Sequence, residues 1–198
     1  MKKDSTELVC ILDRSGSMAG LESDTIGGFN AMLKKQAALE GECRVTTILF
    51  DHHVSTLHDR IDIRGIAPLT EKEYFVGGCT ALYDAVGIGI DRIAKAQKNT
   101  AEDYRAEHVI FLITTDGMEN ASRHYSGKKV RKMIDKMKKK YGWEFIFSGA
   151  NIDAAETADE MGIGCANSIQ FDATPVGVAC MFDAACRDMT RRRVSRKK

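Results

Sequence analysis

Short runs of apolar and β-branched residues alternate along the chain with longer segments in which apolar residues recur at helical spacing. The short runs have the length of buried strands and cover residues 7–12, 44–50, 108–114 and 143–148, with a weaker run at 167–171. Helical spacing of three or four residues links four sets of apolar positions, which begin at Ile26, Leu82, Val130 and Val178. Strands that alternate with helices predict a mostly parallel sheet covered by helices on both faces.

One connection between strands is too short for a crossover helix. Only residues 51–53 separate the run that ends at Phe50 from a further apolar stretch at 54–57. A tight hairpin is therefore predicted, with 54–57 as an antiparallel edge strand and 60–74 as an irregular return. The expected fold is a three-layer, Rossmann-like α/β domain with six strands, of which this edge strand is the one antiparallel member.

Polar residues follow two of the predicted strands and a glycine turn. In "VCILDRSGSMAG" the first strand runs into Asp13, Ser15 and Ser17, whose alternate positions aim their side chains the same way in extended chain. The strand in "FLITTDG" ends at Asp116, and "GGCT" delivers Thr80 to the start of a helix. In a doubly wound sheet the first and fourth strands are neighbours where the strand order reverses, which would place Asp13 beside Asp116.

These two carboxylates and three hydroxyls are all hard oxygen donors. Such donors suit Mg²⁺ or Mn²⁺, and Ca²⁺ less well. A helix N-cap is the alternative for the D-x-S-x-S segment alone, because Ser and Asp are favoured there. The two further segments favour a metal site, and its ion would present an open position to a carboxylate of a partner.

The segments "DRSGSM", "GGCT" and "TTDG" resemble the metal-ion-dependent adhesion site (MIDAS) of von Willebrand factor type A (vWA) domains. The resemblance covers most of the chain, and "SDTIGGFNAML" and "GGCTALYDAV" are most similar to small bacterial intracellular members. It implies direct metal ligation by Ser15, Ser17 and Thr80, and ligation often through water by Asp13 and Asp116. It further implies a non-catalytic module that binds proteins of bacterial stress-response, chaperone-like ATPase or metal-resistance systems.

The composition is that of an ordinary folded protein. The 198 residues are 43% hydrophobic and carry a net charge of +1, which gives no general attraction to nucleic acid or to an anionic membrane. We expect one domain over residues 1–190 and a basic, disordered tail over 191–198. Because neither a signal peptide nor a membrane span is evident, we expect a cytoplasmic protein that is monomeric when free.

Several side chains near the predicted site have more than one interpretation. The six cysteines lack zinc-binding spacing and are expected to be reduced, although oxidation of Cys79 would disturb the adjacent Thr80. The irregular spacing of His52, His53 and His58 around the hairpin favours solvent exposure over metal ligation. Residues 118–120 either line the rim of the site or form a solvated loop.

Two other functions deserve comparison with protein binding. Asp13 is a conceivable nucleophile for a metal-assisted phosphohydrolase or phosphoryl transferase, but Ser15 stands where the aspartyl-phosphate pattern has a second acid. The tail could serve a nucleic-acid adaptor, because "TRRRVSRKK" holds six cations in nine residues, without interleaved aromatic residues. The lysines of 127–142 fit the solvated face of a surface helix better than an acid-binding patch, and the glycines lack nucleotide-binding spacing.

Overall fold

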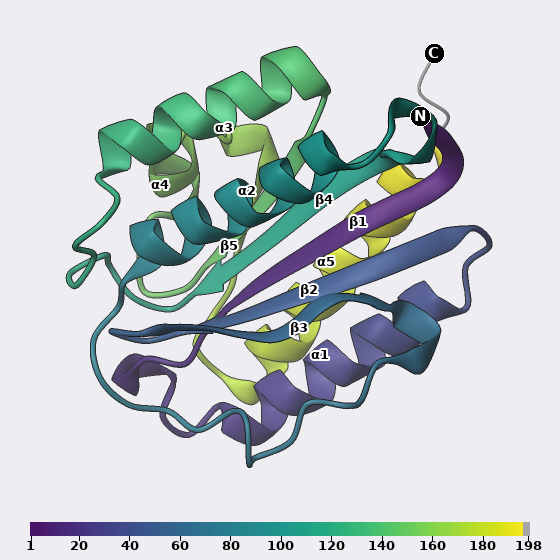
Figure 1. Ribbon diagram of the computed structural model, residues 1–198. Coiled ribbons are helices and arrows are strands. Elements are labelled where there is room, and N and C mark those ends of the chain that lie inside the picture. The colour runs from purple at the N-terminus through teal and green to yellow at the C-terminus, as the bar shows by residue number, and fades with distance from the viewer. Residues whose placement is uncertain (196–198) are drawn as a thin grey trace.

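A six-stranded sheet lies at the centre of the computed structural model, which describes residues 1–195, and helices cover both of its faces (Figure 1). The strands are β1 (Lys2–Asp13), β2 (Glu42–Phe50), β3 (Val54–Asp62), β4 (Ala106–Thr115), β5 (Glu144–Gly149) and β6 (Ser168–Gln170). The helices are α1 (Glu22–Ala37), α2 (Leu82–Asn99), α3 (Gly127–Tyr141), α4 (Ala154–Glu160) and α5 (Pro175–Val194).

The strand order is β3-β2-β1-β4-β5-β6. All neighbouring strands are parallel except β2 and β3, which form the predicted hairpin with β3 at the edge. The predicted fold class is therefore confirmed. Because β1 lies between β2 and β4, the chain reverses its direction of winding at β1, and the first and fourth strands are neighbours as expected.

Two hydrophobic clusters fill the spaces on either side of the sheet. Alternate residues of β1 face opposite sides, so that Leu8 packs with α1 and α5 while Val9 packs with α2 and α3. Both side chains are completely buried, as are Phe29 of α1 and Ile90 of α2. Burial of both sheet faces explains why the central strands are almost continuously apolar.

The structure extends several of the predicted elements. β1 begins at Lys2 instead of residue 7, and β3 continues to Asp62 instead of ending at 57. The seven-residue helix α4 was not predicted. Residues 191–194, expected in a disordered tail, form the last turn of α5, so that part of the prediction is wrong; 196–198 lie outside the described residues.

None of the helices within residues 1–195 combines the length and the apolar character that crossing a bilayer requires.

Candidate metal centre

The predicted metal-site residues meet at the carboxyl ends of β1 and β4. Asp13 is the last residue of β1, and Asp116 directly follows β4. The parallel register places Leu12 opposite Thr114, so both chains leave the sheet at the same level. Ser15 and Ser17 follow in the loop after β1, where a short 3-10 turn covers Gly16–Met18.

Three hydroxyl groups form the centre of this cluster. Ser15 Oγ lies 3.1 Å from Ser17 Oγ and 3.1 Å from Thr80 Oγ1. Adjacent ligands of an octahedral Mg²⁺, with metal–oxygen distances of about 2.1 Å, are about 3.0 Å apart. The hydroxyl spacing therefore fits the ion that the sequence predicts, and Ser15 and Thr80 are buried while Ser17 is exposed.

The Asp13 carboxylate is held by hydrogen bonds from within the protein. Oδ1 accepts the Ser15 N–H at 2.7 Å, and Oδ2 accepts the Thr115 hydroxyl at 2.6 Å. Burial raises the pKa of Asp13 to about 6, although these hydrogen bonds act to lower it and nearby Asp116 adds to the increase. With both oxygens engaged, this carboxylate is better placed to act through water than to ligate an ion directly.

Asp116 is bound through only one of its two oxygens. Oδ1 accepts the Ser17 hydroxyl at 2.5 Å, whereas Oδ2 is buried and has no hydrogen-bond partner. Burial also raises the pKa of Asp116, and the Ser17 hydrogen bond opposes that increase. A buried acceptor without a donor is costly, so this oxygen fits a site that a cation completes.

The turn before α2 delivers Thr80 to the cluster. Gly78 has a φ of +73°, which glycine adopts without strain, and its carbonyl accepts the Gly16 N–H at 3.1 Å. The neighbouring Gly77 N–H donates to the Arg14 carbonyl at 2.9 Å. These two bonds join the turn to the loop after β1 and set the position of the Thr80 hydroxyl.

Three further residues support the cluster: Thr115 and Tyr74 were not singled out from the sequence, whereas Asn120 belongs to the segment 118–120, expected either at the rim or in a solvated loop. Thr115 orients Asp13; Asn120 Oδ1 accepts the Thr80 N–H at 2.9 Å; and the Tyr74 hydroxyl donates to the Asp13 carbonyl at 2.5 Å. The "TTDG" segment already placed Thr115 beside Asp116, and that adjacency was the available signal. Tyr74 lay in a return segment without periodicity, so its contact depends on tertiary structure alone.

The segment 118–120 combines the two roles that the sequence left open. Met118 is 75% exposed, while Asn120 reaches inward to Thr80. The Glu119 carboxylate accepts the N–H groups of Tyr83 and Ser122, which organises the loop against the start of α2. The side chain of Glu119 is therefore structural.

The histidine and cysteine predictions have mixed outcomes. His52 and His53 are exposed as expected, but His58 is buried, with Nδ1 3.0 Å from Thr47 Oγ1, so its predicted exposure is wrong. All six cysteines are free, as expected, and Cys79 is exposed beside Thr80.

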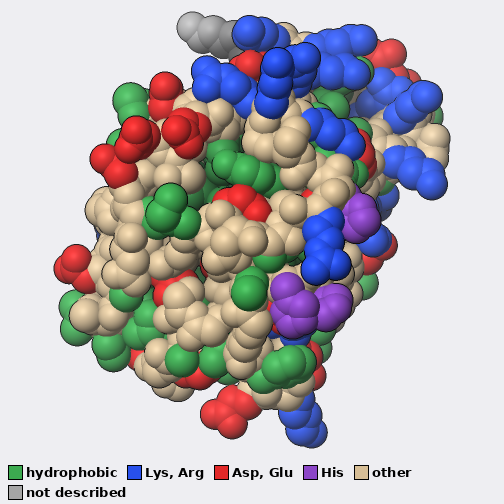
Figure 2. Space-filling view, turned by 90° about the vertical axis from the view of Figure 1, so that its left-hand side faces the viewer, with side chains coloured by type: hydrophobic (Ala, Val, Ile, Leu, Met, Phe, Trp, Pro, Cys, Tyr) green, Lys and Arg blue, Asp and Glu red, His purple; other side chains and the backbone are tan. Residues whose placement is uncertain are grey.

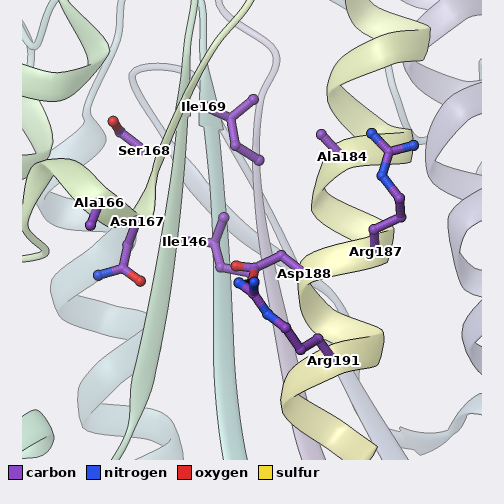
Figure 3. Close-up of a pocket in the computed structure, with 9 residues that line it drawn as sticks. All are labelled: Ile146, Ala166, Asn167, Ser168, Ile169, Ala184, Arg187, Asp188 and Arg191. Atoms are coloured by element: carbon purple, nitrogen blue, oxygen red, sulfur yellow. Dashed lines mark hydrogen bonds and ion pairs between the residues drawn. The ribbon is translucent and has the colours of Figure 1, made fainter.

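A separate hollow of about 350 Å³ lies between β5, β6 and α5 (Figure 3). Its charged side chains are partly paired: the carboxylate of Asp188 meets the guanidinium of Arg191, while Arg187 points away from them. None of the five predicted metal-site residues lines this hollow. The candidate chemistry therefore lies at the strand ends and outside this hollow.

Comparisons with known proteins give matches in structure and none in sequence. No family model matches the chain, and no curated protein matches its sequence. The vWF domain of the type V pili tip protein Mfa5 from Porphyromonas gingivalis is similar with a TM-score of 0.69 and 12% identity, over 98% of this chain and 97% of that one.

Two further structures are longer than the present chain. The PilB minor pilin from Streptococcus sanguinis, as a D319A mutant, has a TM-score of 0.69 and 12% identity, over 95% of this chain and 62% of that one. Proximal thread matrix protein 1 from the mussel byssus, with a zinc-occupied MIDAS motif, has a TM-score of 0.64 and 12% identity, over 93% of this chain and 48% of that one. At these identities the similarity concerns the fold, and this chain has the fold of a von Willebrand factor type A domain.

Proposed function

We propose that this chain is a divalent-metal-dependent module that binds a protein partner through a carboxylate. Ser15, Ser17 and Thr80 would hold Mg²⁺ or Mn²⁺ directly, with Asp13 and Asp116 behind them. The observation that carries the proposal is the hydroxyl cluster next to Asp116 Oδ2, a buried acceptor without a hydrogen-bond partner. Bound there, the ion supplies a positive centre with a coordination position for an acidic side chain.

The spacing of the ligands supports a small ion. Ca²⁺, with oxygen distances of about 2.4 Å, would need neighbouring ligands about 3.4 Å apart in an octahedral arrangement. The hydroxyls of Ser15 and Thr80 are closer than that, at 3.1 Å. Zinc in the MIDAS of the mussel protein supports a divalent ion in this fold without selecting among the metals.

Exposed apolar side chains would help to select the partner. Met118 is 75% exposed beside Asp116, and Phe75 is 57% exposed where the Arg14 guanidinium covers its ring at 4.6 Å. An aromatic side chain and a methionine are well suited to the apolar part of an interface. We propose that these residues contact the partner around its docked carboxylate.

The enzyme alternative finds less support. Asp13, the conceivable nucleophile, is 1% exposed, and both carboxylate oxygens accept hydrogen bonds. A nucleophile must reach the substrate, and this side chain is turned toward Ser15 and Thr115 instead. We therefore propose a non-catalytic role; a phosphoester screen of the wild type and Asp13→Ala tests it.

The nucleic-acid alternative depends on cations that the fold already uses. Arg192 Nη2 lies 2.7 Å from Asp188 Oδ2, and Arg193 Nη1 donates to the Gln36 carbonyl at 2.7 Å. Charges that are paired within the protein neutralise fewer phosphates. The absence of membrane binding, the cytoplasmic location and the monomeric state remain predictions.

The metal step is tested first, with Mn²⁺ as the probe in electron paramagnetic resonance titrations. The wild type should bind one equivalent, Thr80→Ala should bind at least about tenfold more weakly, and Thr56→Ala, on the edge strand, should match the wild type. Equal Mn²⁺ binding by Thr80→Ala and wild type would contradict the proposed site.

The docking step is then tested by affinity capture from a bacterial lysate with Mg²⁺ and with chelator. A partner retained by the wild type and by Thr56→Ala, but lost with chelator or with Thr80→Ala, supports docking through the ion. Its acidic residues can then be replaced one at a time by the corresponding amides. If the partner is retained equally in chelator and by Thr80→Ala, binding through the ion is refuted.

A further inference from the structure

A second cluster of metal-ligating side chains lies at the tip of the β2–β3 hairpin. Asp51, His52 and His53 bring one ligand atom each within 4.8 Å of one another. The two imidazole rings are 4.0 Å apart, and histidines gather on the face of the molecule that Figure 2 shows. None of these residues belongs to the hydroxyl site.

The distances within this cluster fit tetrahedral coordination. Asp51 Oδ1 lies 3.3 Å from His52 Nδ1 and 3.6 Å from His53 Nδ1. Two ligands of a tetrahedral Zn²⁺, each about 2.1 Å from the ion, are about 3.4 Å apart. The three side chains are therefore already near the positions that such an ion requires.

We propose that Asp51, His52 and His53 bind a transition-metal ion of the Zn²⁺ type, at a site distinct from the hydroxyl cluster. Imidazole is a preferred ligand of Zn²⁺, Ni²⁺ and Cu²⁺, whereas Mg²⁺ and Ca²⁺ prefer oxygen. Three protein ligands leave the fourth position to water or to a ligand from outside.

The surroundings of Asp51 prepare one oxygen for this ion. The Arg14 Nε lies 3.2 Å from Oδ2, so the guanidinium faces that oxygen and leaves Oδ1 toward the histidines. The His53 N–H donates to Oδ1 at 2.6 Å, which fixes the turn. The Asp51 side chain is 8% exposed, whereas those of His52 and His53 are 50% and 76% exposed, so an ion in solution can reach them.

The charge on Arg14 also explains the preference for imidazole-binding ions. Because the guanidinium already offsets the carboxylate, the cluster offers little net negative charge to a hard cation. An ion that binds by coordination to nitrogen depends less on that charge. The hydroxyl cluster and this cluster would thus select oxygen-preferring and nitrogen-preferring ions, respectively, by their ligands.

The position of His52 is constrained by the glycine turn. A Cβ added at Gly78 would lie 2.1 Å from His52 Nδ1, so the ring packs directly against this glycine. The Ala81 N–H donates to the Asp51 carbonyl at 2.8 Å and ties the hairpin to the same turn. These contacts hold His52 beside Asp51 before any ion arrives.

Zinc binding by itself would not assign the site, because zinc occupies the MIDAS of the mussel protein. The test therefore uses Asp116→Asn, which weakens the hydroxyl site, as the background for all variants. Isothermal titration with Zn²⁺ compares this background with added His52→Ala, His53→Ala or His124→Ala. His124 is an exposed histidine in another loop and serves as the matched control.

We expect the background to bind one Zn²⁺, with at least about tenfold weaker affinity after His52→Ala or His53→Ala and no change after His124→Ala. Co²⁺ should bind with the visible spectrum of a tetrahedral nitrogen and oxygen site. The proposal is overturned if Asp116→Asn alone abolishes zinc binding or if both histidine variants match the background. A thiolate-to-cobalt charge-transfer band would overturn it as well, since it would assign the ion to a cysteine.

Discussion

Two buried carboxylates on the same strand differ in what balances their charge. Glu7, near the start of β1, is 2% exposed, and Asp13, at its end, is 1% exposed. The Arg60 guanidinium donates to Glu7 Oε1 at 2.6 Å through Nη2, with further bonds from Nε, and Gln97 adds one at 3.4 Å. Asp13 has only neutral donors, Ser15 N–H and the Thr115 hydroxyl.

This difference separates a charge that the fold neutralises with its own cation from one that it leaves with neutral donors alone. The fold supplies a cation for Glu7 by sending Arg60 over it from β3. At the other end of β1 the fold brings Asp116 toward Asp13 instead, and burial raises the pKa of both. A pair of acids assembled without a cation from the protein is what the proposed metal site requires.

The largest effect on stability should come from removing Arg60, the cation that pairs with Glu7. Arg60→Met leaves Glu7 buried without its partner, which should lower the free energy of unfolding by about 3–5 kcal/mol. Urea titration followed by circular dichroism measures this loss. Arg64→Met, which breaks an exposed pair with Asp62, is the control and should leave the midpoint unchanged. Equal midpoints for Arg60→Met and wild type would remove the basis of the comparison.

Removing the charge of Asp13, at the other end of β1, should instead raise the free energy of unfolding when no metal is bound. In chelator at pH 7, Asp13→Asn removes a charge whose folded pKa, about 6, exceeds its ordinary value of 3.8. A difference of roughly two between the folded and unfolded pKa corresponds to at most about 3 kcal/mol, so the variant should be more stable by up to that amount. If Asp13→Asn instead lowers the free energy of unfolding in chelator, the charge of Asp13 does not destabilise the folded protein.

The gain from Asp13→Asn should depend on pH. The folded carboxyl holds its proton more tightly than the unfolded one, so the contribution of Asp13 to stability is complete below about pH 4 and is lost as the pH rises through about 6. Wild type and variant should therefore converge in chelator near pH 4 and separate toward pH 7. If the stabilities of wild type and Asp13→Asn differ by the same amount from pH 4 to pH 7, the difference comes from packing and not from the charge.

Added metal should favour the wild type by a smaller amount. Mg²⁺ at ten times its dissociation constant should raise the free energy of unfolding by about 1.4 kcal/mol. Ser17→Ala, which removes a hydroxyl from the cluster, should lose this gain, and Ser55→Ala on the edge strand should keep it. The measurement is urea titration with and without the ion. An equal gain in Ser17→Ala would place the ion elsewhere.

The smallest effect should come from a residue that only positions a ligand. Asn120→Ala leaves the Thr80 N–H without the Oδ1 acceptor at 2.9 Å, a loss of about 1 kcal/mol. Mn²⁺ affinity should fall severalfold, less than after Thr80→Ala. Met118→Ala, exposed in the same loop, should leave Mn²⁺ affinity unchanged. Equal affinities for Asn120→Ala and wild type would limit Asn120 to loop structure.

The pattern of the sequence was sufficient for most of the fold. Buried strands and amphipathic helices repeat their apolar residues with a fixed period, so β4 and α3 could be located in advance. Helix α4 could not, because seven residues with two buried alanines, Ala154 and Ala158, carry too weak a pattern. Periodicity also fails where a strand continues past its buried part, as in the half of β3 that ends at Asp62.

The residues predicted to meet at the strand ends do lie together, whereas the supporting contacts of Thr115 and Tyr74 were not predicted. Asp13 and Asp116 stand at strand ends, where the strand order brings side chains together. The contacts of Tyr74 and Asn120 depend on the paths of loops, which no local pattern specifies. The burial of His58 follows from the extension of β3, since its imidazole meets Thr47 across the hairpin.

The bond between Ser17 and Asp116 joins residues that are 99 positions apart. During synthesis on the ribosome, the loop after β1 therefore emerges long before the strand that completes its site. Until β4 pairs with β1, the early segment has neither its neighbouring strand nor its second acid, so the proposed metal site is incomplete. Acquisition of metal by the nascent chain would thus report the moment at which the centre of the sheet closes.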